Sequence, residues 1–269
     1  MASGTTPRSS SLSRSGRLLL PVLAAAAPLG ACGLPSEPAP QGPPAERHGA
    51  RAVADVERVE RTRASLVAAV NLYELRRGAE AVRHLDDARA GYAGLRPRVR
   101  ARAPVLDREV VAAFARARAA MVRGAPPRPP LARVRALNDQ LTAGVLETLV
   151  PKAARDDAGL RAEVARRLTA RLARTYAAGV REPGPTRGRL RLQRAYGLLT
   201  RAGLTARGLG DTLGPVRPEV LEPLRGIRDR VWPTGIERPP SPPPAPDRVT
   251  RAARRVNGAL VERFDLGER

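Results

Sequence analysis

Apolar residues recur every three or four positions along most of the chain after residue 51. In the first such stretch, Val53, Val56 and Val59 are separated mainly by charged residues. This spacing is typical of an amphipathic helix that buries one face against the rest of the protein. The sequence therefore predicts a first helix that begins near residue 52 and stops near Gly78.

The same periodicity predicts seven further helices. Proline cannot continue a helix, so Pro97, Pro151 and the segment GAPPRPP separate neighbouring helices. Asp157 precedes one apolar stretch and has a side chain that suits the N-cap of a helix. The predicted segments are 79–95, 105–122, 131–150, 154–180, 189–207, 220–231 and a last helix from residue 247.

Composition favours the same fold class. Only 3% of the 269 residues are aromatic while 42% are hydrophobic. Leu, Val and Ala must therefore fill the core, and these residues suit helix interfaces. We expect an all-α bundle of about six to seven helices over residues 51–235. A stiff proline-rich linker, residues 236–246, then separates a detached C-terminal helix at 247–269.

Two tyrosine pairs indicate a possible internal repeat. Tyr73 and Tyr92 can be aligned with Tyr176 and Tyr196, at offsets of 103 and 104 positions. Residues 51–150 and 155–235 would then form two similar helical units packed together. The alternative is a chance similarity, because helices rich in alanine and arginine resemble one another by composition.

The first 31 residues have the layout of a secretory signal peptide. Arg8, Arg14 and Arg17 precede an apolar run, residues 18–31, that ends in small residues. As a helix this run would be about 20 Å long, which is shorter than the roughly 30 Å hydrocarbon layer of a bilayer. We expect residues 1–31 to direct export and not to remain as a membrane span.

The only cysteine lies at the end of this run. The sequence Leu29-Gly30-Ala31-Cys32 resembles the lipobox of bacterial lipoproteins. The resemblance implies that the Cys32 thiol is alkylated with diacylglycerol and that the signal is cut before it. It predicts a lipid-anchored protein on the extracytoplasmic face of the cell membrane, with residues 32–50 as a disordered tether. The alternatives are an ordinary secretory signal that contains a cysteine, or a buried structural cysteine.

The charge balance points to anionic partners. The formal net charge is +22, from 48 basic and 26 acidic residues, and removal of residues 1–31 would still leave +19. A body this basic is attracted to phospholipid head groups or acidic envelope polymers in a salt-sensitive way. Nucleic acid is not an expected partner, because the chain is predicted to be exported and lacks aromatic platforms that stack bases.

The sequence offers little for catalysis and one candidate metal site. It has no glycine-rich phosphate loop, no HExxH and only two histidines, so we expect a protein that is not an enzyme. Glu80, His84 and Asp87 share one face of the second predicted helix, and such ligands suit iron, zinc or manganese. The alternative is a solvated face on which the two acids pair with neighbouring arginines. No other cofactor is predicted.

Between residues 72 and 149, a tyrosine and a glycine are followed by an alanine and a tyrosine, a proline, a Pro-x-Leu turn and a helix with a central phenylalanine. The positions are Tyr73, Gly78, Ala88, Tyr92, Pro97, Pro104, Leu106, Phe114 and Gly124. This pattern resembles the extracytoplasmic helical domain of bacterial high-affinity iron permeases. The membrane helices of those permeases are absent, so the resemblance implies at most an accessory role in iron uptake.

Three functional hypotheses follow from these observations. The first is a lipid-anchored envelope protein whose helical domain binds a partner or has a structural role. The second is an accessory iron-binding component of an uptake system. The third is a binder of anionic lipid or envelope polymer.

Overall fold

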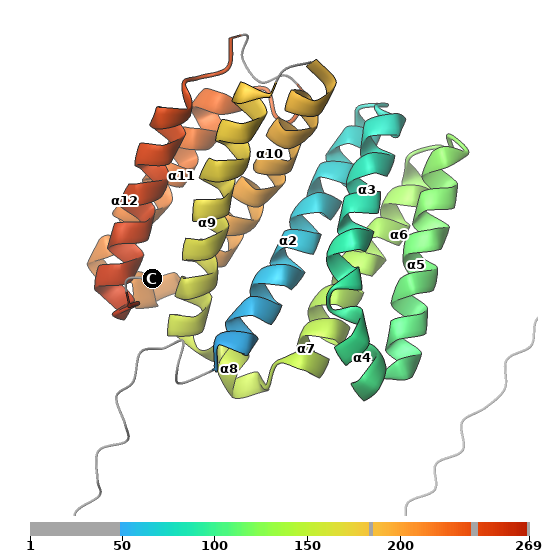
Figure 1. Cartoon of the computed structure of the whole chain (residues 1–269), viewed down its shortest axis with the longest axis horizontal. Coiled ribbons are helices and arrows are strands. Elements are labelled where there is room, and N and C mark those ends of the chain that lie inside the picture. The colour runs from blue at the N-terminus through green and yellow to red at the C-terminus, as the bar shows by residue number, and fades with distance from the viewer. Residues whose placement is uncertain (1–48, 183–184, 238–241, 268–269) are drawn as a thin grey trace, which may run out of the picture. The chain divides into compact units, whose positions relative to one another are not determined.

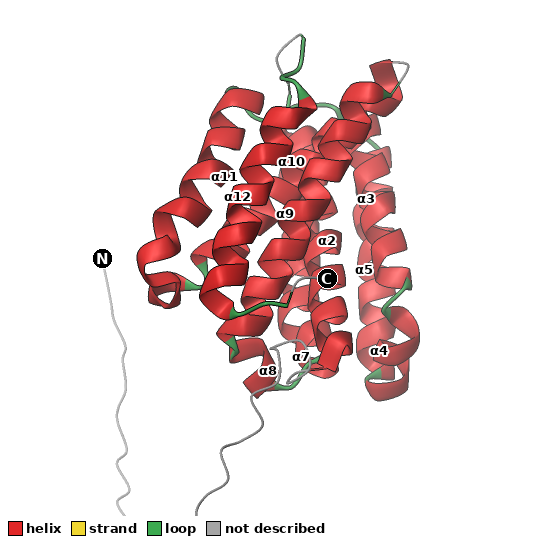
Figure 2. Cartoon of the chain, turned by 60° about the vertical axis from the view of Figure 1, so that its left-hand side comes forward, coloured by secondary structure: helices red, strands yellow, loops and turns green. Residues whose placement is uncertain are grey.

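A computed structural model describes residues 49–182, 185–237 and 242–267, and every regular element in these ranges is a helix. The all-α fold class is therefore confirmed (Figure 2). The elements are α2 (Gly49–Glu74), α3 (Gly78–Ala93), α4 (Arg96–Arg102), α5 (Pro104–Val122), α6 (Arg128–Asp139), a π-helical turn η1 (Gln140–Val145), α7 (Leu146–Leu149), α8 (Lys152–Asp156), α9 (Ala158–Arg181), α10 (Pro185–Arg207), a 3₁₀ segment η2 (Gly210–Val216), α11 (Arg217–Val231) and α12 (Pro246–Phe264).

Each predicted helix has a counterpart whose ends lie within about five residues of the prediction, and the helix predicted at 131–150 corresponds to α6, η1 and α7 in succession. Asp157 is the N-cap of α9, because its Oδ1 accepts a hydrogen bond from the Leu160 backbone N–H at 2.6 Å. The short helix α4 was not predicted. Its proline, Pro97, lies in the first turn, where the missing backbone N–H costs no intrahelical bond. The predicted signal peptide, Cys32 and residues 33–48 lie outside the described residues.

The described helices fall into two halves with the same arrangement. In the first half, α2, α3, α5 and α6 pack in a ring, each against the next, and α6 closes the ring on α2. In the second half, α9, α10, α11 and α12 pack in the same order. Figure 1 shows α2 next to the second half, where it packs against α9 and α10.

Corresponding hydrogen bonds support an internal repeat. The Tyr73 hydroxyl donates to the Ala125 carbonyl at 2.6 Å, and the Tyr176 hydroxyl donates to the Pro244 carbonyl at 2.7 Å. Both carbonyls lie in the connection before the last helix of their half. In the first helices, identical residues recur 103 positions apart. These pairs are Arg58 and Arg161, Glu60 and Glu163, Arg63 and Arg166, and Tyr73 and Tyr176.

The second helices match in a different register. Arg58 donates to the Gly94 carbonyl at 2.8 Å, and Arg161 donates to the Gly208 carbonyl at 3.2 Å. Each glycine follows the second helix of its half, and the two are 114 positions apart. The offset between the second helices is eleven residues larger than the offset between the first helices. Because eleven residues are close to three helical turns, corresponding residues of α3 and α10 still lie on the buried face. The predicted pairing of Tyr92 with Tyr196 is therefore wrong, because Tyr92 corresponds to position 206.

The C-terminal helix belongs to the bundle. α12 packs against α9 and α11 and buries Val249, Val256 and Leu260. The prediction of a detached helix is therefore wrong. An amphipathic helix with so strong an apolar stripe needs a partner surface, and the second half provides one. Residues 238–241 of the predicted linker lie outside the described residues.

The two halves approach each other closely where α10 crosses α2. A Cβ atom at Gly197 would lie 2.2 Å from the backbone oxygen of Ala64. Only glycine allows this approach without a shift of one helix. None of the helices in the described ranges has the length and hydropathy needed to cross a bilayer.

Candidate functional site at the junction of the two halves

Glu80, His84 and Asp87 lie on one face of α3, and this face is turned toward α10. His84 Nε2 lies 3.1 Å from Gln193 Oε1, and the Gln193 amide donates to Glu80 Oε2 at 2.5 Å. Asp87 forms an ion pair with Arg194. The predicted cluster therefore exists, and its side chains connect the two halves of the protein.

The same contacts argue against a metal ion at this cluster. The second carboxylate oxygen of Glu80 lies 2.9 Å from Arg77 Nη2 and 3.2 Å from Arg189 Nη2. These guanidinium groups would repel a cation. Nowhere in the described ranges do three or more His, Cys, Asp or Glu side chains gather as a metal-binding group. The geometry therefore does not favour the predicted metal site.

His84 is fully buried, and burial lowers its pKa below the ordinary value of histidine. Its Nδ1 has no hydrogen-bond partner and lies 3.8 Å from Asp87 Oδ2. Because the Gln193 amide N–H₂ donates to Glu80, the Gln193 oxygen is left to accept from His84 Nε2. This network assigns a proton to Nε2, and burial favours the neutral form of the imidazole.

A second polar cluster contains one buried carboxylate between two arginines. Glu60 in α2 accepts a 2.7 Å hydrogen bond from Arg63 and a 2.6 Å hydrogen bond from Arg201 Nε in α10. Arg63 Nε also donates to Asn138 Oδ1 at 2.9 Å. The side chains of Glu60, Arg63 and Arg201 are only 7%, 13% and 11% exposed. This cluster therefore places a net positive charge in a region largely excluded from water.

A basic groove of about 440 Å³ runs along the junction between α2, α3, α9 and α10. Its cations come from three helices, while Thr62, Ser65 and Thr175 contribute hydroxyl groups. Asp87 is the one acid among the described lining residues. The charged residues that define the groove are Arg58, Arg61, Arg171, Arg194 and Asp87.

The arginines of the basic groove are only partly compensated. Asp87 pairs with Arg194. Glu57, beside the groove, lies 3.9 Å from Arg61 and 3.4 Å from Arg171, and it is shared with a further arginine outside the groove. Burial, followed by the charge of Arg171, lowers the pKa of Arg61. The groove therefore holds like charges close together, and a bound anion would relieve their repulsion.

Close packing of α3 on α2 shapes the floor of the groove. A Cβ atom at Gly91 would lie 2.6 Å from Thr62 Oγ1, and one at Gly94 would lie 2.7 Å from an Arg58 terminal nitrogen. The two glycines therefore let the α2 side chains lie against α3. The Arg58 guanidinium is held in place by its hydrogen bond to the Gly94 carbonyl.

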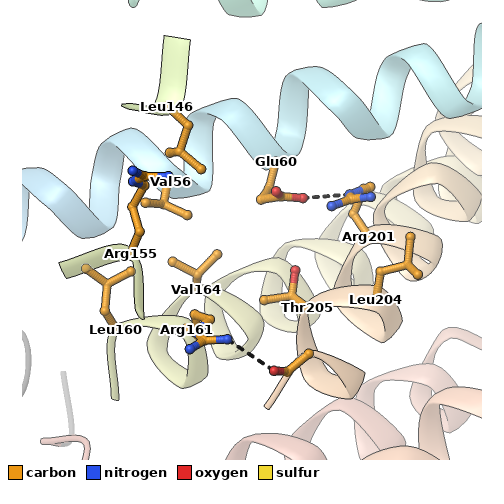
Figure 3. A pocket seen from close by; sticks show the side chains of 11 residues that line it. Val56, Glu60, Leu146, Arg155, Leu160, Arg161, Val164, Arg201, Leu204 and Thr205 are labelled. Carbon is orange, nitrogen blue, oxygen red and sulfur yellow. Dashed lines mark hydrogen bonds and ion pairs between the residues drawn. The ribbon is translucent and has the colours of Figure 1, made fainter. Parts of the chain in front are cut away.

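An apolar pocket of about 170 Å³ opens on the opposite face of α2. Figure 3 shows aliphatic side chains around it, with Glu60 and Arg201 on one wall and Arg155 and Arg161 on the other. Arg155 donates to Glu147 at 3.1 Å. The aliphatic lining residues are Val56, Leu146, Leu160, Val164 and Leu204.

The residues that carry the permease resemblance lie in the first half. Tyr92 donates its hydroxyl to Asp107 Oδ1 at 3.0 Å, and its ring centroid lies 6.0 Å from that of Phe114. Tyr73 holds the connection before α6 through its bond to Ala125. In this chain these residues stabilise the helical packing.

The sequence did not identify the basic groove or the apolar pocket. Arg58 and Arg61 are three residues apart on one helix, which is the only local signal for the groove. Arg171 and Arg194 reach it from helices more than a hundred residues away. A search of family models, of curated proteins and of solved structures finds no match for this chain.

Proposed function

We propose that this protein is a lipid-anchored protein of the cell envelope whose helical domain binds a phosphate-bearing anion without catalysis. The observation that carries the proposal is the basic groove, in which four arginines from three helices face one lining acid. Guanidinium groups present several N–H donors in a fixed plane, which suits phosphate oxygens. The Thr62 hydroxyl already donates to the Arg58 carbonyl, so Ser65 and Thr175 are the groove hydroxyl groups that would supply further hydrogen-bond donors.

The proposed location rests on the resemblance of residues 29–32 to a lipobox. A diacylglycerol anchor on Cys32 would hold the basic domain close to anionic head groups and phosphate-containing envelope polymers. Attraction between exposed charges extends over about 10 Å at ordinary salt concentrations. A short tether would keep the basic domain within this distance of the membrane surface. The side chains of Arg61, Arg171 and Arg194 are 36–45% exposed and therefore accessible to such a ligand.

The anchor is tested by fractionation of cells that express the full chain. Cys32→Ala, or inhibition of the lipoprotein signal peptidase, should leave a precursor or move the protein out of the lipid-anchored membrane fraction. An unmodified chain of unchanged mass in the wild type would contradict the anchor.

The groove is tested with two probes on the purified full chain carrying Cys32→Ala. Vesicles that contain phosphatidylglycerol represent a lipid head group, and soluble glycerol phosphate represents a free phosphate ester. Arg61→Gln combined with Arg171→Gln should weaken binding of the preferred probe at least tenfold, because the loss of even one charged hydrogen bond of about 1.5–3 kcal/mol corresponds to a tenfold change or more. Binding should also weaken as salt is raised.

A matched control has the same net charge. Arg116 in α5 and Arg133 in α6 are exposed and lie outside the groove. Arg116→Gln combined with Arg133→Gln should change binding less than twofold, by comparison with the tenfold effect at the groove. Equal losses in the two double variants would mean that binding depends on total charge and would overturn the assignment to the groove.

A further inference from the structure

The apolar pocket and the basic groove occupy equivalent positions in the two halves. Each lies between the first and second helices of its half, beside the glycine that follows the second helix. Lining residues of the groove correspond to lining residues of the pocket at an offset of 103 positions in the first helices and 114 positions in the second helices. Three such pairs are Arg58 and Arg161, Ala90 and Leu204, and Gly94 and Gly208. Each half of the repeated fold therefore has a cavity at the equivalent position.

Two substitutions between the halves change the chemistry of this cavity. Val164 stands in the pocket where Arg61 stands in the groove, and Arg201 stands where Asp87 stands. The first change removes a cation from the wall, and the second places a cation where the groove has its acid. Arg155 and Arg161 also line the pocket, but Arg155 is bonded to Glu147 and Arg161 to the backbone carbonyls of Asp156 and Gly208. The pocket therefore suits a ligand with an apolar body and one negative charge.

Charge balance supports an anionic ligand. Glu60 is shared between Arg63 and Arg201, so one buried carboxylate faces two guanidinium groups. Asp139, the other acid that acts on Arg63, is exposed. A buried charge without a full partner is costly, and a ligand carboxylate beside Arg201 would supply the missing negative charge.

The size of the pocket limits the apolar body. An apolar cavity of about 150 Å³ is large enough to hold benzene, and this pocket measures about 170 Å³. Leu204, on the pocket wall, is 42% exposed although it is a large aliphatic residue. We infer that the pocket is a second binding site, for a small carboxylate on a benzene-sized apolar body, with its carboxylate paired to Arg201. This inference does not depend on the proposed function of the groove.

The test uses benzoate as the probe, with the full chain carrying Cys32→Ala, and isothermal calorimetry at neutral pH. Benzyl alcohol and benzylamine have the same ring with a neutral and a positive group. Saturable binding is expected for benzoate, at least tenfold weaker binding for the alcohol and none for the amine. Failure of benzoate to bind the wild-type chain, or equal binding of the alcohol, would overturn the inference.

Two variants locate the binding. Thr205→Phe fills the pocket from its half-exposed wall and should abolish benzoate binding. Arg201→Met removes the anion partner but leaves Glu60 paired with Arg63, so the protein should fold and bind benzoate at least tenfold more weakly. Benzoate binding that survives both changes would contradict the site. Thermal melting by circular dichroism verifies that each variant is folded.

The two sites can be separated in one set of proteins. Thr205→Phe should leave binding of the phosphate probe unchanged, and the Arg61→Gln, Arg171→Gln variant should leave benzoate binding unchanged. Loss of both activities in Thr205→Phe would mean that the substitution disturbs the whole junction, and the assignment of benzoate to the pocket would then be rejected unless Arg201→Met lost benzoate binding alone.

Discussion

Tyr73 and Tyr176 make the same hydrogen bond in the two halves of the protein. Each lies near the C-terminal end of the first helix of its half and donates its hydroxyl to a carbonyl that precedes the last helix. Both rings are buried. Each tyrosine therefore fixes the connection that lets the fourth helix return to the first.

If the two halves are equivalent, removal of the Tyr73 hydroxyl and removal of the Tyr176 hydroxyl should lower the free energy of unfolding by similar amounts. The acceptor carbonyls of Ala125 and Pro244 lie in partly exposed connections, where water can replace the lost donor. Tyr73→Phe and Tyr176→Phe should each lower the free energy of unfolding by about 0.5–1.5 kcal/mol. Urea denaturation followed by circular dichroism measures both. A large cost in one half with none in the other would contradict a shared role.

Gly197 should tolerate no larger side chain. The Cβ atom of Gly197→Ala would lie 2.2 Å from a backbone oxygen of Ala64, which cannot rotate away, so α2 and α10 would have to separate. We expect a loss of about 1–3 kcal/mol in the free energy of unfolding.

Gly203 in the same helix provides the control. Its added Cβ would meet only the end of the Arg207 side chain, at 3.9 Å. Gly203→Ala should therefore stabilise the protein by about 0.5–1 kcal/mol through helix propensity. If the two alanine variants had equal stability, the close contact of α10 with α2 would be wrong.

His84 should make the protein sensitive to mild acid. Burial holds its pKa in the folded state below the value of about 6.5 in the unfolded chain. The unfolded chain therefore binds the proton more readily, and stability that is present above pH 6.5 is lost as the pH falls below it. The slope should approach 1.4 kcal/mol per pH unit at most.

The measurement compares urea midpoints between pH 7.5 and 5.5. Wild-type protein should lose stability over this range, whereas His84→Gln should lose little, because glutamine does not titrate. The carboxylates of the network, Glu80 and Asp87, are present in both proteins and therefore do not account for a difference between the two curves. An identical decline in His84→Gln would show that another group is responsible.

The helices could be predicted from the sequence because their signals are local. Pro97 and Pro151 separate helices by their covalent structure, and Asp157 caps α9 through a backbone group three residues away. The repeat was predicted in part, since the match of Tyr73 with Tyr176 follows from one offset. The second helices match at an offset of 114 positions, which the tyrosine spacing does not indicate, and the two arginine-to-glycine carbonyl bonds identify it. Five identical pairs then follow: Ala81 and Ala195, Leu85 and Leu199, Ala88 and Ala202, Gly94 and Gly208, and Leu95 and Leu209.

The candidate sites depend on contacts that no local pattern encodes. Arg201 reaches Glu60 across 141 residues of sequence, and Arg171 and Asp87 meet in the groove only after the halves pack together. The C-terminal helix is another case in which the local sequence pattern does not identify the contact partner. Its apolar stripe indicated that Val256 and Leu260 need a partner, but the identity of that partner, α9, is a property of the whole bundle.

Glu60 should be the most costly single charge to remove from the junction. Glu60→Gln leaves Arg63 and Arg201 together in a region where their side chains are only 13% and 11% exposed. Breaking a buried ion pair by removing one partner typically costs about 3–5 kcal/mol, because a buried charge is left uncompensated. We expect a loss of this size in urea denaturation at neutral pH.

The equivalent residue of the second half supplies the comparison. Glu163 is as buried as Glu60, but its partners Arg166 and Arg167 are 17% and 28% exposed, and Arg167 also lies 3.7 Å from Glu57. Glu163→Gln should therefore cost less than Glu60→Gln. The double change Glu60→Gln with Arg201→Gln should recover part of the loss, because only one buried guanidinium then lacks a carboxylate. If the double variant lost more unfolding free energy than the two single variants lose together, Arg201 would support the junction by packing and not by charge.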